Sequence, residues 1–371
     1  MRGMKVVLSV MLLCSLLGCT PEKPAPKVLV TLPDTCHTPD GCTLTDSGDI
    51  ILSIPNFNNQ ALIDANQLSA PQRPLMVKID AKNVLTPWYK FTAADNQPDT
   101  GTVGPMGCDI GPDGHLYVAD NQLFSDPDHK SRLLRITIEG GKAVKCDPVV
   151  EGFIVSNAVV WHGDTVYVSE TVLEATPEVA EGETKAPLMS GIYAFKIDEF
   201  AQGPITLQPW SKTSADPHLI ATFETNNSVG FGADGLTVDG QGNLYCGIFE
   251  SGVVHKTSFN ADGSVKETTE FAKASNMACG DGIFWREADN KIYVADMLLN
   301  AVQAVDMQGK VTTVHKNGDT DGADGGLDQP CEVIVRGNEL IVINMDMLFE
   351  NERLTNTAID EPYTVSVIKL P

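Results

Sequence analysis

A six-fold repeat of paired short strands constrains this chain more than any other feature. Each copy begins with a polar or small residue, runs into an apolar stretch and turns. A second apolar stretch starts nine to eleven residues after the leading residue. Successive leading residues lie 66, 51, 77, 47 and 50 residues apart, a period typical of propeller blades rather than of helical repeats. The six leading residues are Asp40, Met106, Asn157, Asp234, Asp281 and Cys331.

This pattern predicts an all-β, six-bladed β-propeller with a central channel, formed by residues 31–371. Period-two alternation also predicts a third strand in several blades, for example at 131–136 and 190–195. We expect the last strand, 364–368, to close the ring, because closure leaves only short, protected edges. Three insertions, at 92–104, 172–188 and 345–362, interrupt the repeat. Such insertions lie on a rim, either as solvated loops or as the wall of a pocket mouth.

The N-terminus predicts export and a lipid anchor. Residues 1–18 combine two basic residues with a short apolar stretch that ends in Leu-Leu-Gly before Cys19. This ending resembles the bacterial lipobox, so Cys19 is the expected lipidation site; an ordinary secretory signal is the alternative. Residues 19–30 contain three prolines and read as a tether. The predicted location is the bacterial cell envelope, at the outer membrane, facing the periplasm or the cell surface.

The net charge limits the possible binding partners, and the number of cysteines limits the possible disulfide bonds. The chain has 26 basic and 49 acidic residues and a net charge of −23, which excludes a nucleic-acid partner and suits a domain that gathers cations. We therefore expect a small-molecule substrate, and membrane contact through the lipid anchor alone. An odd number of cysteines follows the tether, so at least one thiol stays free or pairs between chains, and a Cys36–Cys42 bond is one possible pairing. These cysteines are Cys36, Cys42, Cys108, Cys146, Cys246, Cys279 and Cys331.

The leading residues are the candidate functional site. Asp40, Asp234 and Asp281 would converge on the channel axis, where like charges raise one another's pKa unless a cation or a proton is present. Together with the Asn157 amide they form an oxygen-only donor set, which selects Ca²⁺ or Mg²⁺, with calcium favoured; Mn²⁺ and Zn²⁺ are not excluded. The alternative is turn chemistry, because Asp caps turns and the glycine that follows supplies a positive φ.

One segment resembles a known family. Residues 232–245, Gly-Ala-Asp-Gly-Leu-Thr-Val-Asp-Gly-Gln-Gly-Asn-Leu-Tyr, are similar to the signature Pro-Asp-Gly-Met-x-x-Asp-x-x-Gly-x-Leu-Trp of the senescence marker protein 30/gluconolactonase family. These six-bladed propellers hydrolyse lactones or organophosphates with a divalent metal in the channel. The segment that begins at Asn157 resembles the family's Pro-Asn-Gly-Leu-x-Trp, and Asp40 stands where the family has glutamate.

The resemblance implies that Asp234 is a metal ligand and the catalytic nucleophile or base, and that Asn157 is a second ligand. Three departures qualify it: Asp40 is one methylene shorter than glutamate, Met106 stands where many relatives have asparagine, and Asp281 is an additional carboxylate. The leading hypothesis is a metal-dependent hydrolase of lactones or related esters. The alternatives are a non-catalytic binding propeller of the cell envelope and a metal-free enzyme of the strictosidine-synthase-like kind.

Two further acidic groups carry weaker hypotheses. Glu332 follows the leading residue Cys331 and is expected to point sideways into a blade interface. Asp319, Asp321, Asp324 and Asp328 have a spacing similar to that of a calcium loop. They lack the glycine and glutamate pattern of an EF-hand, which favours an inter-blade loop.

Overall fold

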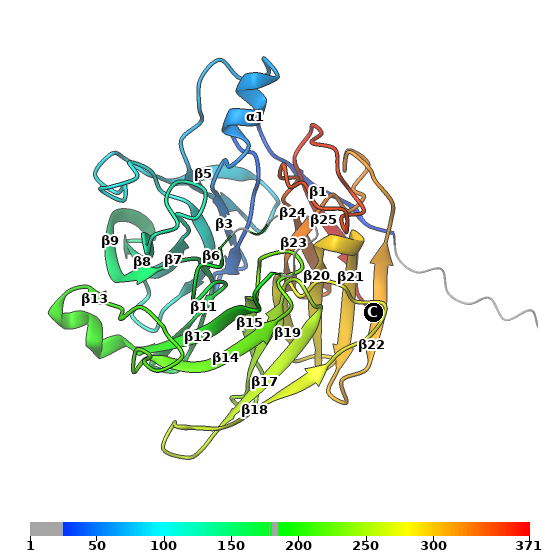
Figure 1. Ribbon diagram of the computed structural model, residues 1–371. Coiled ribbons are helices and arrows are strands. Elements are labelled where there is room, and N and C mark those ends of the chain that lie inside the picture. The colour runs from blue at the N-terminus through cyan, green and yellow to red at the C-terminus, as the bar shows by residue number, and fades with distance from the viewer. Residues whose placement is uncertain (1–24, 178, 180–184) are drawn as a thin grey trace, which may run out of the picture.

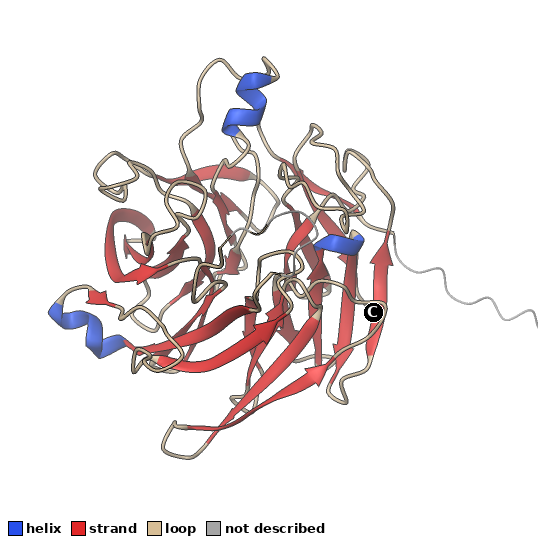
Figure 2. Cartoon of the chain, viewed as in Figure 1, coloured by secondary structure: helices blue, strands red, loops and turns tan. Residues whose placement is uncertain are grey.

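Six antiparallel sheets stand around a central axis and form a six-bladed propeller, as predicted (Figure 1). The computed structural model describes residues 25–177, 179 and 185–371. The predicted signal peptide 1–18 and the lipidation site Cys19 lie outside these residues. The innermost strands contact one another in the order β2, β6, β10, β15, β19, β23 and back to β2, which closes the ring. Figure 2 shows that strands dominate the molecule and that its helices are short.

The first three blades are each built from neighbouring antiparallel strands. Blade 1 contains β2 Cys42–Leu44, β3 Ile50–Ile54, β4 Leu75–Ile79 and β5 Leu85–Lys90. Blade 2 contains β6 Pro105–Ile110, β7 Leu116–Asp120, β8 Ser131–Glu139 and β9 Lys142–Phe153, with the short β13 Ile205–Thr206 parallel to β9. Blade 3 contains β10 Ser156–His162, β11 Thr165–Glu170, β12 Leu188–Lys196 and β14 Leu219–Thr225.

The other three blades follow the same plan. Blade 4 contains β15 Ala233–Val238, β16 Leu244–Ile248, β17 Val253–Phe259 and β18 Val265–Ala272. Blade 5 contains β19 Ile283–Arg286, β20 Lys291–Asp296, β21 Ala301–Asp306 and β22 Val311–Lys316. Blade 6 contains β23 Pro330–Arg336, β24 Glu339–Asn344, β25 Thr364–Lys369 and β1 Lys27–Thr31.

The closing strand differs from the prediction. Strand β25 is the third strand of blade 6, and the outermost position is taken by the N-terminal β1, which pairs with β25 through Lys27↔Val367 and Thr31↔Thr364 (Figure 1). The propeller therefore starts at Lys27, inside the segment 19–30 that the prolines predicted to be a tether. The two ends of the chain share one sheet, so unwinding blade 6 requires both to separate.

In four of the six blades the second strand is buried along its whole length, and in the other two only its first residue is partly exposed. Every residue of β3, β7, β11 and β16 is buried, because each of these strands has a neighbouring blade on both faces. This double packing explains why their sequences are nearly continuous apolar runs, whereas a strand with one wet face would alternate. The outer strands β5 and β18 carry more exposed residues, since they form the rim.

Helices play a small part. The α-helix α1 Asn59–Asp64 and the 3₁₀ turns η1 Ile197–Gln202 and η2 Met297–Leu299 lie in connections between strands. Within the part of the chain that the structure describes, no helix has the length and apolar character needed to cross a membrane. The predicted insertions at 92–104 and 345–362 are irregular connections.

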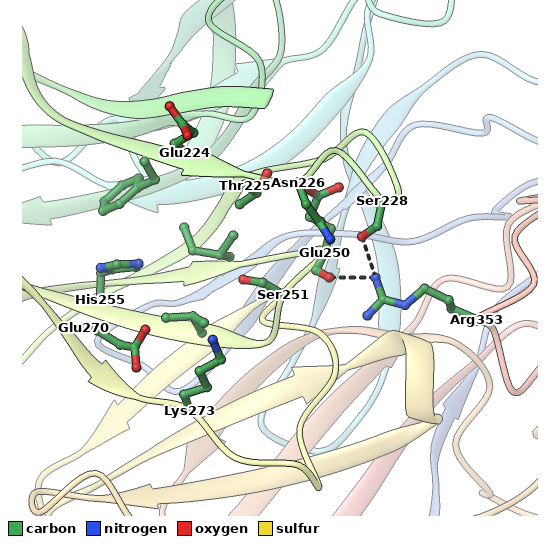
Figure 3. A pocket seen from close by; sticks show the side chains of 13 residues that line it. Glu224, Thr225, Asn226, Ser228, Glu250, Ser251, His255, Glu270, Lys273 and Arg353 are labelled. Carbon is green, nitrogen blue, oxygen red and sulfur yellow. Dashed lines mark hydrogen bonds between the residues drawn. The ribbon is translucent and has the colours of Figure 1, made fainter. Parts of the chain in front are cut away.

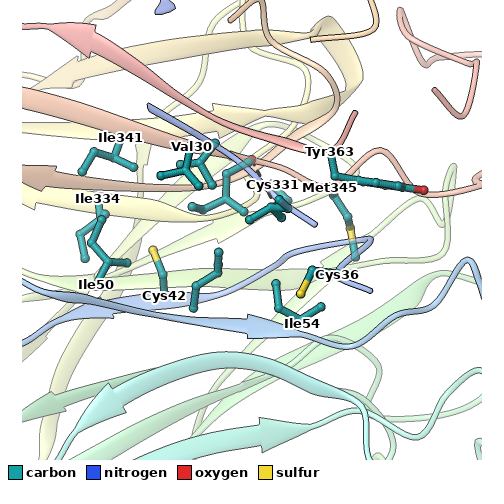
Figure 4. Close-up of a cluster of buried hydrophobic side chains, with 14 of the residues drawn as sticks. Val30, Cys36, Cys42, Ile50, Ile54, Cys331, Ile334, Ile341, Met345 and Tyr363 are labelled. Carbon is teal, nitrogen blue, oxygen red and sulfur yellow. Dashed lines mark hydrogen bonds between the residues drawn. The ribbon is translucent and has the colours of Figure 1, made fainter. Parts of the chain in front are cut away.

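The seven cysteines after the tether are all free thiols, and six of them are buried. Figure 4 shows Cys36 and Cys42 in the apolar cluster between blade 6 and blade 1, together with Ile54 and Tyr363. The structure therefore contains no Cys36–Cys42 bond, and these thiols act as small apolar groups in the core.

Candidate functional site

All six leading residues of the repeat line one cavity of about 60 Å³, which we call the ring cavity. Each lies at or just before the start of an innermost strand, so the six-fold arrangement brings residues nearly 300 positions apart in sequence together at the axis. The remaining lining side chains are apolar, apart from one asparagine. They are Asn121, Phe124, Val155, Phe231, Phe249, Met297, Met345, Met347 and Phe349.

The glycines that follow the leading residues are required by close backbone contact rather than by turn chemistry. None of Gly41, Gly107, Gly235 and Gly282 has a positive φ. A Cβ on Gly235 would lie 2.2 Å from the carbonyl oxygen of Asp281, and one on Gly107 would lie 2.6 Å from that of Asn157. Backbones of successive blades therefore touch around the axis, and the turn interpretation of these Asp-Gly pairs is wrong.

A buried polar side chain in each blade holds the loop that delivers the leading residue. The side chain lies at or just after the end of the second strand and accepts hydrogen bonds from backbone amides two to four residues before the leading residue. In blade 5, Asp296 accepts from Ala278 N at 3.1 Å and from Cys279 N at 3.0 Å, two residues before Asp281. We call these side chains the loop anchors; they are Asn56, Asp120, Glu170, Glu250, Asp296 and Asn344.

The three carboxylates of the ring cavity perturb one another. Burial, more than any other cause, raises the pKa of Asp40 to about 7. The pKa values of Asp234 and Asp281 lie well above the ordinary value, first because both side chains are buried and second because the other carboxylates repel their charge. Three such groups cannot all be ionised at neutral pH unless a cation compensates them.

Of the three carboxylates, that of Asp234 accepts the fewest hydrogen bonds. Asp281 Oδ1 accepts a hydrogen bond from Gly282 N at 3.0 Å, and the amide of Gly41 lowers the otherwise raised pKa of Asp40. Across the described ranges no group donates a hydrogen bond to the Asp234 carboxylate. Its oxygens are therefore the ones available to a ligand, a water molecule or a cation.

The donor set suits a hard divalent cation, but the side chains do not form a finished metal site. Carboxylate and amide oxygens are the ligands that Ca²⁺ and Mg²⁺ prefer. However, in residues 25–177, 179 and 185–371 no three His, Cys, Asp or Glu side chains are placed so that one metal ion could bind them all. The roles of Asp40, Asn157, Asp234 and Asp281 as ligands thus stay predictions, although the structure brings the four residues together.

Glu332 faces a second cavity that is lined by residues of the inner strands. Its side chain lines this cavity of about 110 Å³ with Asp109 and Thr237, rather than the ring cavity. Asp109 is well partnered there, accepting from Trp161 N at 2.8 Å and Thr43 Oγ1 at 2.9 Å. Burial is the main cause that raises the pKa of Glu332 well above its ordinary value.

The acidic run 319–328 forms an inter-blade loop between β22 and β23, as its departure from the EF-hand pattern suggested. Asp321 Oδ1 accepts from Ala323 N and Asp324 Oδ1 from Gly326 N, both of which are local turn contacts. Asp328 alone is buried, and it accepts a hydrogen bond from Asn356. None of these carboxylates lines the ring cavity.

Sequence reasoning missed most of the apolar cavity wall. Asn121, Phe249, Met297 and Met345 each follow the last residue of a blade's second strand directly, so they form a second tier of equivalent positions above the leading residues. The repeat carries this signal, because the position is fixed relative to the second strand. It was obscured because these residues are chemically unlike one another.

Comparisons with known proteins reveal the fold rather than a close relative. No known sequence family and no curated protein matches the chain. Among solved structures, a luciferin-regenerating enzyme superimposes with a TM-score of 0.57 at 11% identity, covering 94% of this chain and 97% of that chain. A gluconolactonase from Xanthomonas campestris does so with a TM-score of 0.52 at 10% identity, covering 95% and 96%.

A PQQ-bound aldose sugar dehydrogenase from Streptomyces coelicolor also superimposes, with a TM-score of 0.53 at 14% identity over 94% of this chain and 99% of that chain. The chain therefore has the six-bladed propeller fold of gluconolactonase-like proteins, as the segment around Asp234 predicted. Because the same fold also carries redox chemistry, the function has to be argued from the ring cavity.

Proposed function

We propose that this protein is a hydrolase of lactones or related esters that acts in the ring cavity with a divalent cation, calcium in the first instance. The observation that carries the proposal is the convergence of Asp40, Asp234 and Asp281 with Asn157 on a single cavity with apolar walls. The likeness in fold to the gluconolactonase from Xanthomonas campestris supports this reaction class.

In the proposed reaction Asp234 is the general base. Its unpartnered carboxylate accepts a proton from a water molecule, whose oxygen attacks the lactone carbonyl carbon. In the absence of a cation the neighbouring Asp281 carboxyl group retains its proton, because its pKa is raised well above the ordinary value, and it donates a hydrogen bond to the carbonyl oxygen. The ring C–O bond then breaks, and the proton held by Asp234 passes to the leaving oxygen, which yields the hydroxy acid.

A divalent cation bound by Asp40, Asn157, Asp234 and Asp281 would polarise the carbonyl and keep carboxylates ionised. Among the described residues no histidine lines the ring cavity, so of these residues only the carboxylates can move a proton there near neutral pH. The apolar wall would exclude bulk water from the reacting atoms, which strengthens each of these interactions.

The test measures thermal stability and hydrolysis on the same samples of the full chain. After treatment with a chelator, calcium, magnesium, manganese and zinc are titrated separately. Binding to the folded state alone should stabilise it by about 2.7 kcal/mol at a hundredfold excess over Kd. Asp234→Asn should remove this gain and lower the hydrolysis of a lactone panel by about 10²–10⁴-fold.

Asp262→Asn, in an exposed turn, serves as the matched control and should change neither readout. Retained hydrolysis in folded Asp234→Asn would contradict the assigned base. If Asp234→Asn loses hydrolysis but no cation changes the stability or hydrolysis of the wild-type protein, the metal is contradicted and the carboxylate mechanism stays in place.

A binding propeller without chemistry is the second candidate. It is favoured by the lack of three ligating side chains around one point in the described residues, and by the mostly apolar lining. Saturable ligand binding that survives Asp234→Asn, in a wild-type protein that turns over no ester, would support it.

A further inference from the structure

The wall of the ring cavity is mostly apolar, in contrast to the three carboxylates that it surrounds. Three phenyl rings from separate segments form one side: Phe231 lies 5.6 Å from Phe249 and 5.7 Å from Phe349, measured between ring centroids. Four methionines, Met106, Met297, Met345 and Met347, complete much of the remaining wall. The cavity therefore offers thioether and aromatic surface beside a small acidic centre.

A single segment supplies a large part of this wall. Residues 345–356, which we call the strap, run from the end of β24 past the ring cavity. Met345, Met347 and Phe349 line the cavity, whereas Leu348 between them is 50% exposed. Asp346 is fully buried and has a φ of 42°, so the segment turns there, and alternation between the cavity and solvent holds only from Met347 onward.

Arg353 fastens the strap to blade 4 and to the loop before blade 5. Its guanidinium donates to the Glu250 carbonyl oxygen at 2.7 Å, to Ser228 Oγ at 3.0 Å and to the Ala278 carbonyl oxygen at 3.3 Å. Figure 3 shows Arg353 reaching the Glu250 and Ser228 side of a neighbouring pocket. The strap is thus tied at both ends, which keeps Phe349 against the aromatic group.

Few polar side chains remain to recognise a hydroxylated ligand. Apart from the three aspartates and the Cys331 thiol, the described residues supply two polar side chains to the cavity, Asn121 and Asn157. Asn121 Oδ1 already accepts from Leu123 N at 2.8 Å. Each hydroxyl of a sugar lactone that was buried against phenyl or thioether groups would lose its hydrogen bonds to water without replacement. An alkyl chain would lose nothing comparable and would gain apolar contact.

We infer that the ligand of the ring cavity is a lactone or ester with an apolar alkyl substituent, not a polyhydroxylated sugar lactone, and that the strap selects it. The ester part of this inference rests on the proposed function. Because the cavity holds only about 60 Å³, it has room for little more than the carbonyl group at the aspartates, and the alkyl chain runs out along Met347 and Phe349 to Phe124, which is 54% exposed. Because methionine side chains are flexible, the wall adapts to chains of several lengths.

The experiment compares unsubstituted γ-butyrolactone with γ-lactones that carry straight alkyl chains of two, four, six and eight carbons, and with glucono-δ-lactone, on the full chain. We expect kcat/KM to rise about fourfold for each methylene that becomes buried. Phe349→Ala should flatten this rise with chain length, and Phe349→Leu should restore most of it.

Leu348→Ala is the matched control, because this residue lies on the same strap but faces solvent. It should keep the wild-type dependence on chain length. Faster hydrolysis of glucono-δ-lactone than of every alkyl lactone would overturn the inference and leave the hydrolase intact. An equal loss for all substrates in folded Phe349→Ala would overturn the selecting role of the strap.

A binding readout separates this inference from the proposed reaction. The same alkyl series as γ-lactams, which resist hydrolysis, is titrated while the melting temperature is followed. Stabilisation that grows with chain length in wild type and Leu348→Ala, but not in Phe349→Ala, supports an apolar ligand even if no lactone is hydrolysed. Stabilisation that is absent or independent of chain length overturns it.

Discussion

At the scale of single residues, the same dipeptide serves two separate purposes. In Asp234-Gly235 the aspartate faces the ring cavity, and the glycine lets the next blade's backbone approach. The pair was predictable as a repeat, but the role of its glycine was not, because the contact it permits lies across the blade interface. Gly235 is therefore required by its contact with Asp281, which lies 46 residues further along the chain.

Gly235→Ala should destabilise the protein by about 1–3 kcal/mol or more, because the new Cβ would overlap the carbonyl oxygen of Asp281. Gly318→Ala is the matched control, since Gly318 has ordinary φ and open space around its Cβ position. Urea unfolding of both variants checks the prediction. Equal stability of the two variants would show that the inner strands can separate at little cost.

At the scale of elements, the loop anchors connect stability to the site. Each second strand ends in or near a buried polar side chain that binds the loop before the leading residue of the same blade. The anchors are chemically mixed, with carboxylates in four blades and asparagine in the other two. Each is enclosed by neighbouring strands, so its bonds to backbone amides are shielded from water and from competing hydrogen bonds.

Asp296→Ala should cost about 2–5 kcal/mol, because Ala278 N, Cys279 N and Gln303 Nε2 lose their acceptor. It should also weaken any activity that depends on Asp281. Asp306→Ala is the matched control in the same blade: this carboxylate accepts from two backbone amides in an exposed turn, where water replaces it. Thermal unfolding of the two variants compares them, and a similar cost for both would argue against the anchor role.

At the scale of the whole molecule, buried acids dominate the response to pH. Burial is the main cause that raises the pKa of Asp40 to about 7, of Glu170 to about 8 and of Asp296 to about 6. The folded protein therefore keeps protons that the unfolded chain releases near pH 4. Their contribution to stability is complete below that pH and is lost as the pH rises from about 4 through 8.

Urea unfolding in chelator should accordingly give a free energy of unfolding that falls from pH 5 to pH 9, by at most about 1.4 kcal/mol per pH unit for each group. Asp40→Asn and Glu170→Gln should each flatten the profile, because they remove one titrating group. If a cation binds the ring cavity, calcium should offset the part of the fall in the free energy of unfolding that Asp40 causes. A stability that increases over this range in chelator would contradict the raised pKa values.

The amino-acid sequence by itself determined the all-β repeat, the number of blades and the six residues that meet at the axis. Strand alternation and turn residues are local, and a fixed period projects equivalent positions to one place in a closed ring. The predicted lipid anchor at Cys19 and the metal-ligand roles of the aspartates stay predictions.

Only the tertiary structure decided which strand closes the ring, why the glycines follow the leading residues, and which of the two cavities Glu332 lines. It also placed Phe231, Phe249 and Phe349 on one wall, although more than 100 residues separate the first from the last. These features depend on contacts between segments remote in sequence and on burial from all sides. No local pattern of residues encodes either.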